Sequence, residues 1–254
     1  MGVLDGDQFR QVITDYYGEG SPAYNLLGTA NTNWQDEILR TSVSSDYNLS
    51  VGGTYKILPY RVAVSYTNQN GILKTSAMDR VTASITLNPK FFDNTLSVTA
   101  NVKGFYMHNR FADEGAIGGA VSFDPSQSVR VDNLPIGNGY FTWLKPGTDE
   151  FIGIAPVNPV SLIDERSMKA DVYRSVGNLQ LDYVMPFLPA LHANLNLGYD
   201  VSHSIQHNLM TPDSPLTYKE NKKTGLGQDE RLRQLKRNLL LLSLIHISEP
   251  TRPY

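Results

Sequence analysis

Apolar and polar residues alternate along most of the chain from about Asp46 onward. Side chains of a β-strand point in turn to opposite faces of a sheet, so a period of two predicts strands with one apolar and one polar face. Six runs show the alternation: residues 47–52, 60–67, 80–87, 96–103, 178–183 and 191–201. In the last run, apolar residues occupy every odd position from Leu191 to Val201. We therefore expect an all-β fold built from antiparallel strands.

One early segment follows a helical period instead. In residues 5–18, apolar residues recur at the spacing of one helix face, from Phe9 to Tyr16. Asp5 or Asp7 can cap the first turn, and Gly18 can end the helix. The sequence thus predicts a short N-terminal helix ahead of the strands.

Two architectures produce alternating strands: a soluble β-sandwich or barrel with its polar face in water, and a membrane barrel with its apolar face in lipid. Several runs extend to about 10 or 11 residues, the length of a tilted strand through a bilayer. Tyrosines such as Tyr47, Tyr66 and Tyr106 lie near strand ends, where an interfacial aromatic girdle is found in membrane barrels. Both observations favour the membrane barrel.

The lengths of the connections favour the same architecture. Three connections are short, at residues 56–59, 88–94 and 185–190, and they alternate with longer ones at 68–78 and about 107–171. Membrane barrels have short periplasmic turns at one rim and long extracellular loops at the other. The long connections are therefore predicted to lie outside the cell.

This orientation predicts where the remaining segments of the chain lie relative to the membrane. Residues 1–45 precede a strand that runs from the exterior to the periplasm, so we expect them to form an extracellular segment containing the short helix. Residues 46–241 are predicted to form the barrel strands. Arg61, Arg80 and Lys103 all fall on the polar face. A shift of register by one residue would place each of them in lipid, at a cost of about 2–4 kcal/mol near the midplane.

Composition excludes several other classes of protein. The chain has 254 residues, a formal net charge of -3 and no cysteine, which leaves no electrostatic case for a nucleic-acid partner and excludes a thiolate metal site. No stretch has the roughly 18 apolar residues of a transmembrane helix. His203 and His207 are predicted to be surface residues of a loop without a third ligand. We expect no catalytic residue, metal or cofactor.

The long connection at about 107–171 is the predicted binding region, because loops of this length commonly bind a ligand or partner. Tyr140, Phe141 and Trp143 are the candidate ligand- or partner-binding residues, since aromatic faces suit both sugar rings and protein surfaces. The alternative is that these side chains pack the loop against the barrel mouth. The glycine-rich stretch 114–120 lacks the features of a phosphate-binding loop, and we expect a flexible loop there.

Seven segments carry a recognisable pattern when taken in order: NTNWQDEILRT at 31–41, YNLSVGG at 47–53, YTNQNGIL at 66–73, AIGGAVSFDP at 116–125, GNLQLDY at 177–183, LHANLNLGYD at 191–200 and KRNLLL at 236–241. The last of them resembles the opening of a further strand. Together these segments resemble SusC/RagA-type TonB-dependent transporters, and the resemblance covers about residues 3–241.

The resemblance implies a specific class of transporter. Proteins of this family have 22-stranded barrels in the outer membrane of Gram-negative bacteria, closed by an N-terminal plug. They act with a SusD-like surface lipoprotein and import an oligosaccharide or peptide, using energy relayed by the TonB complex. This chain would supply about six of the strands, with the plug and its TonB contact outside it. A passive porin-like barrel and a soluble β-rich binding or adhesion module remain the alternatives.

Residues 242–254, LSLIHISEPTRPY, resemble the translation of a sequencing adapter. We therefore expect the native sequence to stop near Leu241.

Overall fold

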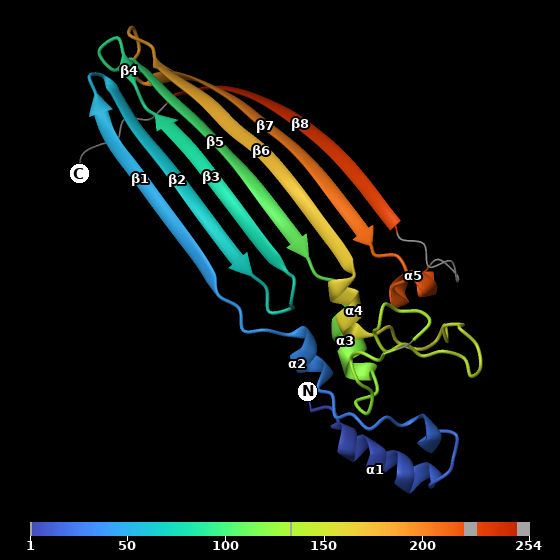
Figure 1. Ribbon diagram of the computed structural model, residues 1–254. Helices are drawn as coiled ribbons and strands as arrows, with labels where there is room; N and C mark the ends of the chain where they lie inside the picture. Colours follow the sequence, from blue (N-terminus) through green and yellow to red (C-terminus); the bar gives the residue numbers. More distant parts are fainter. Residues whose placement is uncertain (1, 133, 221–227, 248–254) are drawn as a thin grey trace.

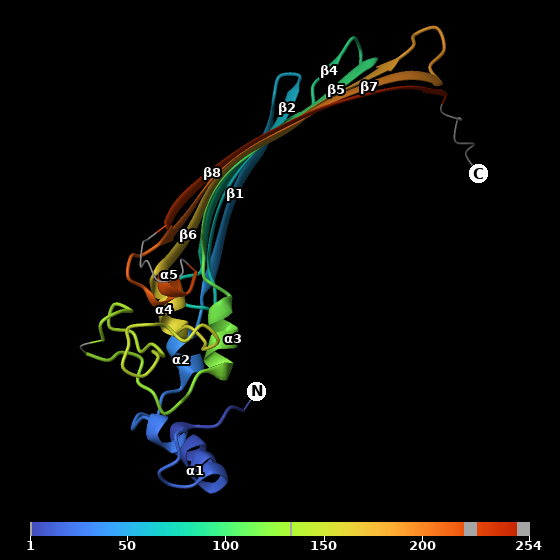
Figure 2. The ribbon, with the colours of Figure 1, turned by 90° about the vertical axis from the view of Figure 1, so that its right-hand side faces the viewer.

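The strands form one curved antiparallel sheet that is capped at one end by helices and loops (Figures 1 and 2). The computed structural model describes residues 2–132, 134–220 and 228–247. Strand order along the sheet is β1-β2-β3-β5-β6-β7-β8, and the short β4 pairs with β5. The strands are β1 Ser44–Tyr55, β2 Leu58–Asn70, β3 Ala77–Leu87, β4 Lys90–Phe91, β5 Leu96–Phe111, β6 Arg166–Val184, β7 Leu191–Met210 and β8 Gln228–Ile247.

The helices gather at the end of the sheet where the long connections lie (Figure 1). They are α1 Gly6–Tyr17, the 3-10 helix η1 Tyr24–Leu26, α2 Trp34–Ile38, α3 Gly115–Ser122, α4 Pro159–Asp164 and α5 Pro215–Glu220. None of the helices in the described ranges has the length and apolar character needed to cross a membrane. The predicted N-terminal helix is confirmed, and Asp5 is its cap.

All six predicted strands are confirmed, and each pairs with its neighbour in an unbroken antiparallel register. The apolar positions of adjacent strands fall opposite one another and form one face, which we call the outward face. Leu49, Val64 and Val81 on this face are 72%, 48% and 46% exposed. A continuous apolar surface of this kind on a single-layer sheet matches the lipid-facing side of a membrane barrel.

Aromatic rings mark a level on the outward face. Tyr47 lies opposite Tyr66, and their rings stack with centroids 6.4 Å apart. Two strands further along, Tyr106 lies opposite Tyr173 at 4.8 Å, and Tyr173 stacks on His203 at 6.4 Å. These five residues, the tyrosine row, correspond to the interfacial girdle expected near the exterior end of the strands.

The opposite, polar face is held by side-chain ladders. Asn178 accepts a hydrogen bond from Asn101 at 3.0 Å and donates one to Asn196 at 2.8 Å, which links three strands. Arg174 binds Asp200 through two bonds of 2.8 and 2.6 Å. A sheet that closes into a barrel with its apolar face in lipid directs these groups into the lumen.

The strands extend further toward the helices than the alternation indicated. β5 continues to Phe111 and β6 begins at Arg166, so the long connection is residues 112–165. The expectation that His203 and His207 lie in a loop is wrong, because both are within β7. Beyond the tyrosine row both faces of the sheet carry polar residues, and the period of two is lost from the sequence.

Two further expectations concern the glycine-rich stretch 114–120 and the C-terminal residues 242–254. The flexible loop expected at 114–120 is wrong: Gly115–Ser122 forms α3, which packs on α2 and α4. In β8, leucines occupy both faces. Leu241 lies opposite Leu197 on the outward face, whereas Leu240 and Leu242 lie opposite Gly198 and Asn196 on the polar face. The adapter origin of residues 242–254 stays a prediction, and 248–254 lie outside the described residues.

The facing of the strands predicts unequal effects of two adjacent substitutions in the full-length protein. Leu179 lies on the outward face of β6, between Tyr173 of the tyrosine row and the short turn at 185–190, and Gln180 lies on the polar face. Leu179→Arg should lower the free energy of unfolding by about 2–4 kcal/mol, because a cation enters lipid. Gln180→Arg should change it by less than about 1 kcal/mol. Urea unfolding in lipid vesicles measures both, and equal losses would contradict the assignment of the faces.

Candidate functional site

The connections at the helical end of the sheet, which is the end predicted to lie outside the cell, form one packed unit. We call it the extracellular assembly: residues 2–43, 71–76, 112–132, 134–165 and 210–218. It has its own hydrophobic core, in which Trp34, Ile38, Ile163 and Met210 are 2% exposed or less. Residues from four separated stretches of the chain contribute to this core. The long connection is therefore an ordered, packed unit at one end of the sheet.

The N-terminal segment is fastened to the long connection by backbone pairing. The N–H of Ala30 donates to the carbonyl of Ser126 at 3.0 Å, and that of Thr32 donates to Pro125 at 2.9 Å. The Trp34 indole adds a hydrogen bond to the carbonyl of Asp124 at 3.0 Å. These contacts join residues about 90 positions apart in sequence and fix α1 and α2 against the loop.

A buried asparagine organises the centre of the long connection. Asn158 is 1% exposed, and its side-chain oxygen caps the N-terminus of α4. Its amide nitrogen donates to the carbonyls of Val129 and Phe141 at 3.0 and 3.3 Å. One side chain thus satisfies backbone groups from three segments, which buried polar groups require.

Tyr140, one of the three predicted site residues, lies in the core and is 3% exposed. Its hydroxyl donates to Asp164 at 2.8 Å and accepts from Arg130, whose guanidinium lies 4.0 Å from the ring centroid. Burial and the bond to Asp164 raise the pKa of Tyr140 above its ordinary value. With its ring and hydroxyl enclosed, Tyr140 holds the loop together.

Phe141 and Trp143 are partly buried against the same core. Their rings form an edge-to-face pair at 4.9 Å, and Phe141 in turn contacts Phe123 at 6.1 Å. Trp143 opens a hairpin in which the N–H of Ile152 donates to its carbonyl. We call residues 140–155 the aromatic hairpin; beyond its last pairing, Ile154 is 97% exposed.

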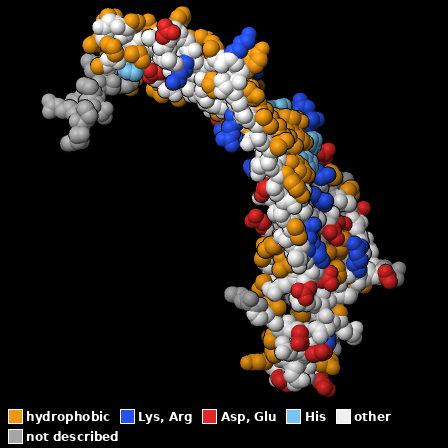
Figure 3. Space-filling model, turned by 90° about the vertical axis from the view of Figure 1, so that its left-hand side faces the viewer, with side chains coloured by type: hydrophobic (Ala, Val, Ile, Leu, Met, Phe, Trp, Pro, Cys, Tyr) orange, Lys and Arg blue, Asp and Glu red, His pale blue; other side chains and the backbone are white. Residues whose placement is uncertain are grey.

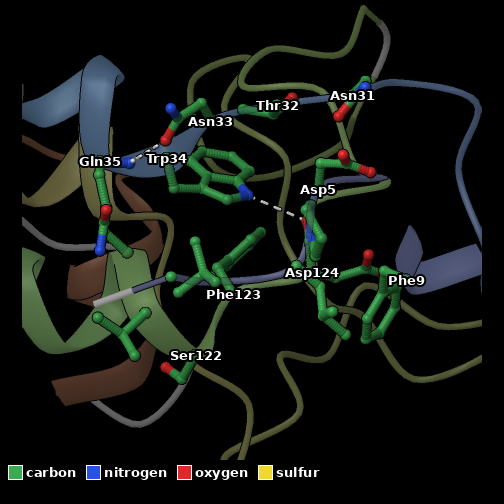
Figure 4. A pocket seen from close by; sticks show the side chains of 16 residues that line it. Asp5, Phe9, Asn31, Thr32, Asn33, Trp34, Gln35, Ser122, Phe123 and Asp124 are labelled. Carbon is green, nitrogen blue, oxygen red and sulfur yellow. Dashed lines mark hydrogen bonds between the residues drawn. The ribbon is translucent and has the colours of Figure 1, made fainter. Parts of the chain in front are cut away.

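A cavity of about 600 Å³ lies between the N-terminal segment and the C-terminal end of α3 (Figure 4). Its polar side chains are mostly committed to local structure. Asp5 and Asn33 cap α1 and α2, and Asp124 accepts a hydrogen bond from the N–H of Ser126. The cavity therefore offers few polar groups to a ligand.

A groove of about 420 Å³ runs between α3 and α4. It is lined by Asp113, Gly115, Gly118, Gly119, Ser122, Pro156, Val157, Leu162, Arg166 and Leu216. A Cβ atom at Gly118 would meet no atom within 4 Å, so there is open space beside this glycine. An ion pair of 2.8 Å between Arg166 and Asp113 lies beside apolar surface from Leu162 and Leu216. This combination of apolar surface and a few polar groups is typical of ligand pockets of similar volume.

The helix beside this groove is apolar on all sides, although only one side is buried. Ala116 and Ala120 face the core, whereas Ile117 and Val121 are 51% and 45% exposed. α3 lies on the concave side of the end of the sheet (Figure 2), which in a closed barrel is the side of the lumen. The sequence analysis did not identify this site, although the all-apolar stretch AIGGAV at 116–121 is typical of a helix that contacts other surfaces on more than one side.

The side chains in the described ranges contain no group of three or more His, Asp or Glu placed to hold a metal ion. The chemistry of the extracellular assembly is thus that of binding surfaces: apolar patches, committed amides and one groove with a charge pair.

Glu165, between α4 and β6, predicts a pH effect on the assembly. Burial raises its pKa from 4.5 to about 7, against the opposing effects of the bond from Asn138 and the charge of Arg130. An acid whose pKa is raised on folding contributes stability below pH 4.5, and this contribution is lost as pH rises through about 7. Hydrogen exchange of residues 158–165 in the full-length protein should therefore accelerate between pH 5 and 8 after correction for the intrinsic rate. Glu165→Gln should remove that acceleration, and a variant that retains it would exclude Glu165 as the cause.

No family model matches the chain. Two curated proteins match part of their length. The chain is 38% identical over 223 residues to the TonB-dependent receptor SusC of Bacteroides thetaiotaomicron, covering 84% of this chain and 22% of that protein. It is 29% identical over 188 residues to the TonB-dependent receptor P3 of Formosa agariphila, covering 69% and 17%. The chain thus spans about a fifth of the length of these relatives.

Solved structures share the fold. The structure of the RagAB peptide transporter superposes with a TM-score of 0.68 at 13% identity, over 95% of this chain and 30% of that chain. The RagAB peptide importer in its open-open state gives 0.61 at 16% identity, over 92% and 26%. The sheet is thus part of a barrel wall, and the predicted resemblance is confirmed. The chain belongs to the SusC/RagA family of TonB-dependent receptors, proteins of the outer membrane of Gram-negative bacteria.

Proposed function

We propose that the chain forms part of the barrel wall and of the extracellular mouth of a TonB-dependent nutrient importer. The observation that carries this proposal is the extracellular assembly, in which the loops of a barrel wall fold into a platform with its own core. A passive pore needs no such platform. Energy would be relayed by TonB through a plug region outside this chain, and the chain itself would perform no chemical reaction.

The proposed substrate is an oligosaccharide or a peptide, and the α3 groove is its proposed contact within this chain. Apolar surface from Leu162 and Leu216 suits the C–H faces of sugars or the side chains of peptides. The ion pair of Arg166 and Asp113 supplies donors and acceptors at the same place. The position of α3 on the lumen side supports a contact made as substrate enters (Figure 2).

The proposed partner is a SusD-like surface lipoprotein that docks on the extracellular assembly. The aromatic hairpin supports this choice, because Trp143 and Ile154 present apolar surface to water at the exterior end. Aromatic and exposed aliphatic residues commonly anchor protein interfaces. Phe141 and Tyr140 would not contact the partner. Their packing against the core would stabilise the conformation of the hairpin.

Blocking the groove tests the substrate contact. Gly118→Leu in the full-length receptor should fill the groove and lower uptake by about tenfold, which corresponds to about 1.4 kcal/mol of lost affinity. The same change should stabilise α3 by up to about 1 kcal/mol, because leucine is the better helix former. Reduced uptake could then not be attributed to unfolding. Gly2→Leu, at another open glycine outside the groove, is the matched control. Unchanged uptake by Gly118→Leu would remove the groove from the pathway.

Changing the hairpin tests the partner contact. Ile154→Asp should weaken the affinity for the lipoprotein by about tenfold, because a charge would replace an interface anchor. Thermal stability should not change, since this side chain is 97% exposed. Val43→Asp, at a position 69% exposed outside the hairpin, is the control. Surface plasmon resonance with purified proteins measures the affinities, and equal affinities for both variants would exclude the hairpin.

A further inference from the structure

Four basic side chains occupy one register position across four neighbouring strands. Arg110 of β5 lies opposite Lys169 of β6, Lys169 lies opposite His207 of β7, and His207 lies opposite Arg231 of β8. The alternation places all four on the outward face, where they form a band that we call the basic row. Figure 3 shows basic and His side chains beside hydrophobic ones along the convex margin of the sheet.

The basic row lies just beyond the level of the membrane interface. Arg110 follows Tyr106 of the tyrosine row by four residues, and Lys169 precedes Tyr173 by four. Four residues of strand rise about 13 Å, which becomes about 10 Å along the membrane normal for a tilted strand. The polar head-group layer is about 5–8 Å thick on each side, and long basic side chains reach back toward it. The row is therefore within reach of the lipid head groups.

Such a row needs counter-charges. Like charges directly opposite one another on adjacent strands are destabilising. None of the ion pairs formed between described residues includes Arg110, Lys169 or Arg231. Lys169 and Arg231 are exposed, and Arg110 and His207 are partly exposed. In the described ranges these cations therefore remain available to an anion from outside the chain.

The carboxylates of the same face leave the row a net positive charge. Asp79 and Asp171 lie one step below it, and each is held at 2.8 Å by two side chains of the outward face. Asp229 lies one step above it on β8, whereas Arg233, one step below, adds a further cation.

We propose that the basic row binds the phosphate groups of an anionic glycolipid in the outer leaflet. Phosphates are the anions that lie at head-group depth, and Arg and Lys pair with them through charge-assisted hydrogen bonds. Below the basic row, the outward face of the sheet is apolar and can contact the acyl chains of the lipid. Just beneath the tyrosine row, the small residues Ala83, Gly104 and Ser175 follow one another across three strands. The lipid would be held by its head group above and its chains below.

The test uses the full-length receptor in detergent micelles and fluorescent lipid A as the probe. Arg110→Gln combined with Lys169→Gln should weaken lipid A binding by about thirtyfold, since each basic side chain near anionic lipid contributes about fivefold. Lys56→Gln combined with Lys90→Gln removes the same charge at the short-turn end of the sheet and should leave binding within about twofold. Arg110→Lys combined with Lys169→Arg keeps both charges and should retain binding.

Three outcomes would overturn the proposal. The first is equal binding by the wild type and the Gln variant. The second is equal binding of lipid A and of lipid A treated with phosphatase, which would show that the phosphates are not recognised. The third is displacement of lipid A by inorganic phosphate alone, which would make the row a site for free phosphate. Uptake and lipoprotein affinity are measured separately, so failure here leaves the proposed function untouched.

Discussion

A strand that crosses a bilayer has no water with which to pair its N–H and C=O groups, so each strand needs a hydrogen-bonded neighbour along its whole length. The seven long strands satisfy this requirement with an unbroken antiparallel register. That register then fixes everything on the two faces, because a slip of one residue would exchange lipid-facing and lumen-facing side chains. The tyrosine row, the Asn101–Asn178–Asn196 ladder and the basic row are all consequences of it.

The constraint ends where the strands leave the membrane, and the structure changes there. Beyond the tyrosine row the sheet carries polar residues on both faces, and its connections fold into helices with a separate core. Backbone groups in this region pair through caps and turns, as Asn158 does at α4. The extracellular assembly is thus free to form a groove and a hairpin on a wall that cannot vary in the same way.

This division explains what the sequence could predict. Within the bilayer, alternation located all six strands, because the environment differs sharply between the faces. Above it, the same strands continue through His203 and His207 without a periodic signal, so their ends were placed too early. α3 was missed because its glycines suggested flexibility, whereas they permit close packing and an open groove.

The site shows the same limit. Aromatic residue type alone predicted Tyr140, Phe141 and Trp143 as binding residues. In the structure all three pack in the same hydrophobic core. Their type could not show that Tyr140 would be enclosed by Arg130 and Asp164. The α3 groove joins Asp113 to Leu216, residues about 100 positions apart, and such long-range packing leaves no local pattern.

The need of each strand for a neighbour is tested most directly by expressing residues 1–254 without the rest of the receptor. Among the described strands, β1 and β8 each pair on one side only. Unpaired edges are unfavourable in lipid and promote association in water. The isolated chain should therefore aggregate, whereas the full-length receptor should run as a heat-resistant barrel band on a gel. A monodisperse, heat-resistant band from residues 1–254 alone would contradict the account.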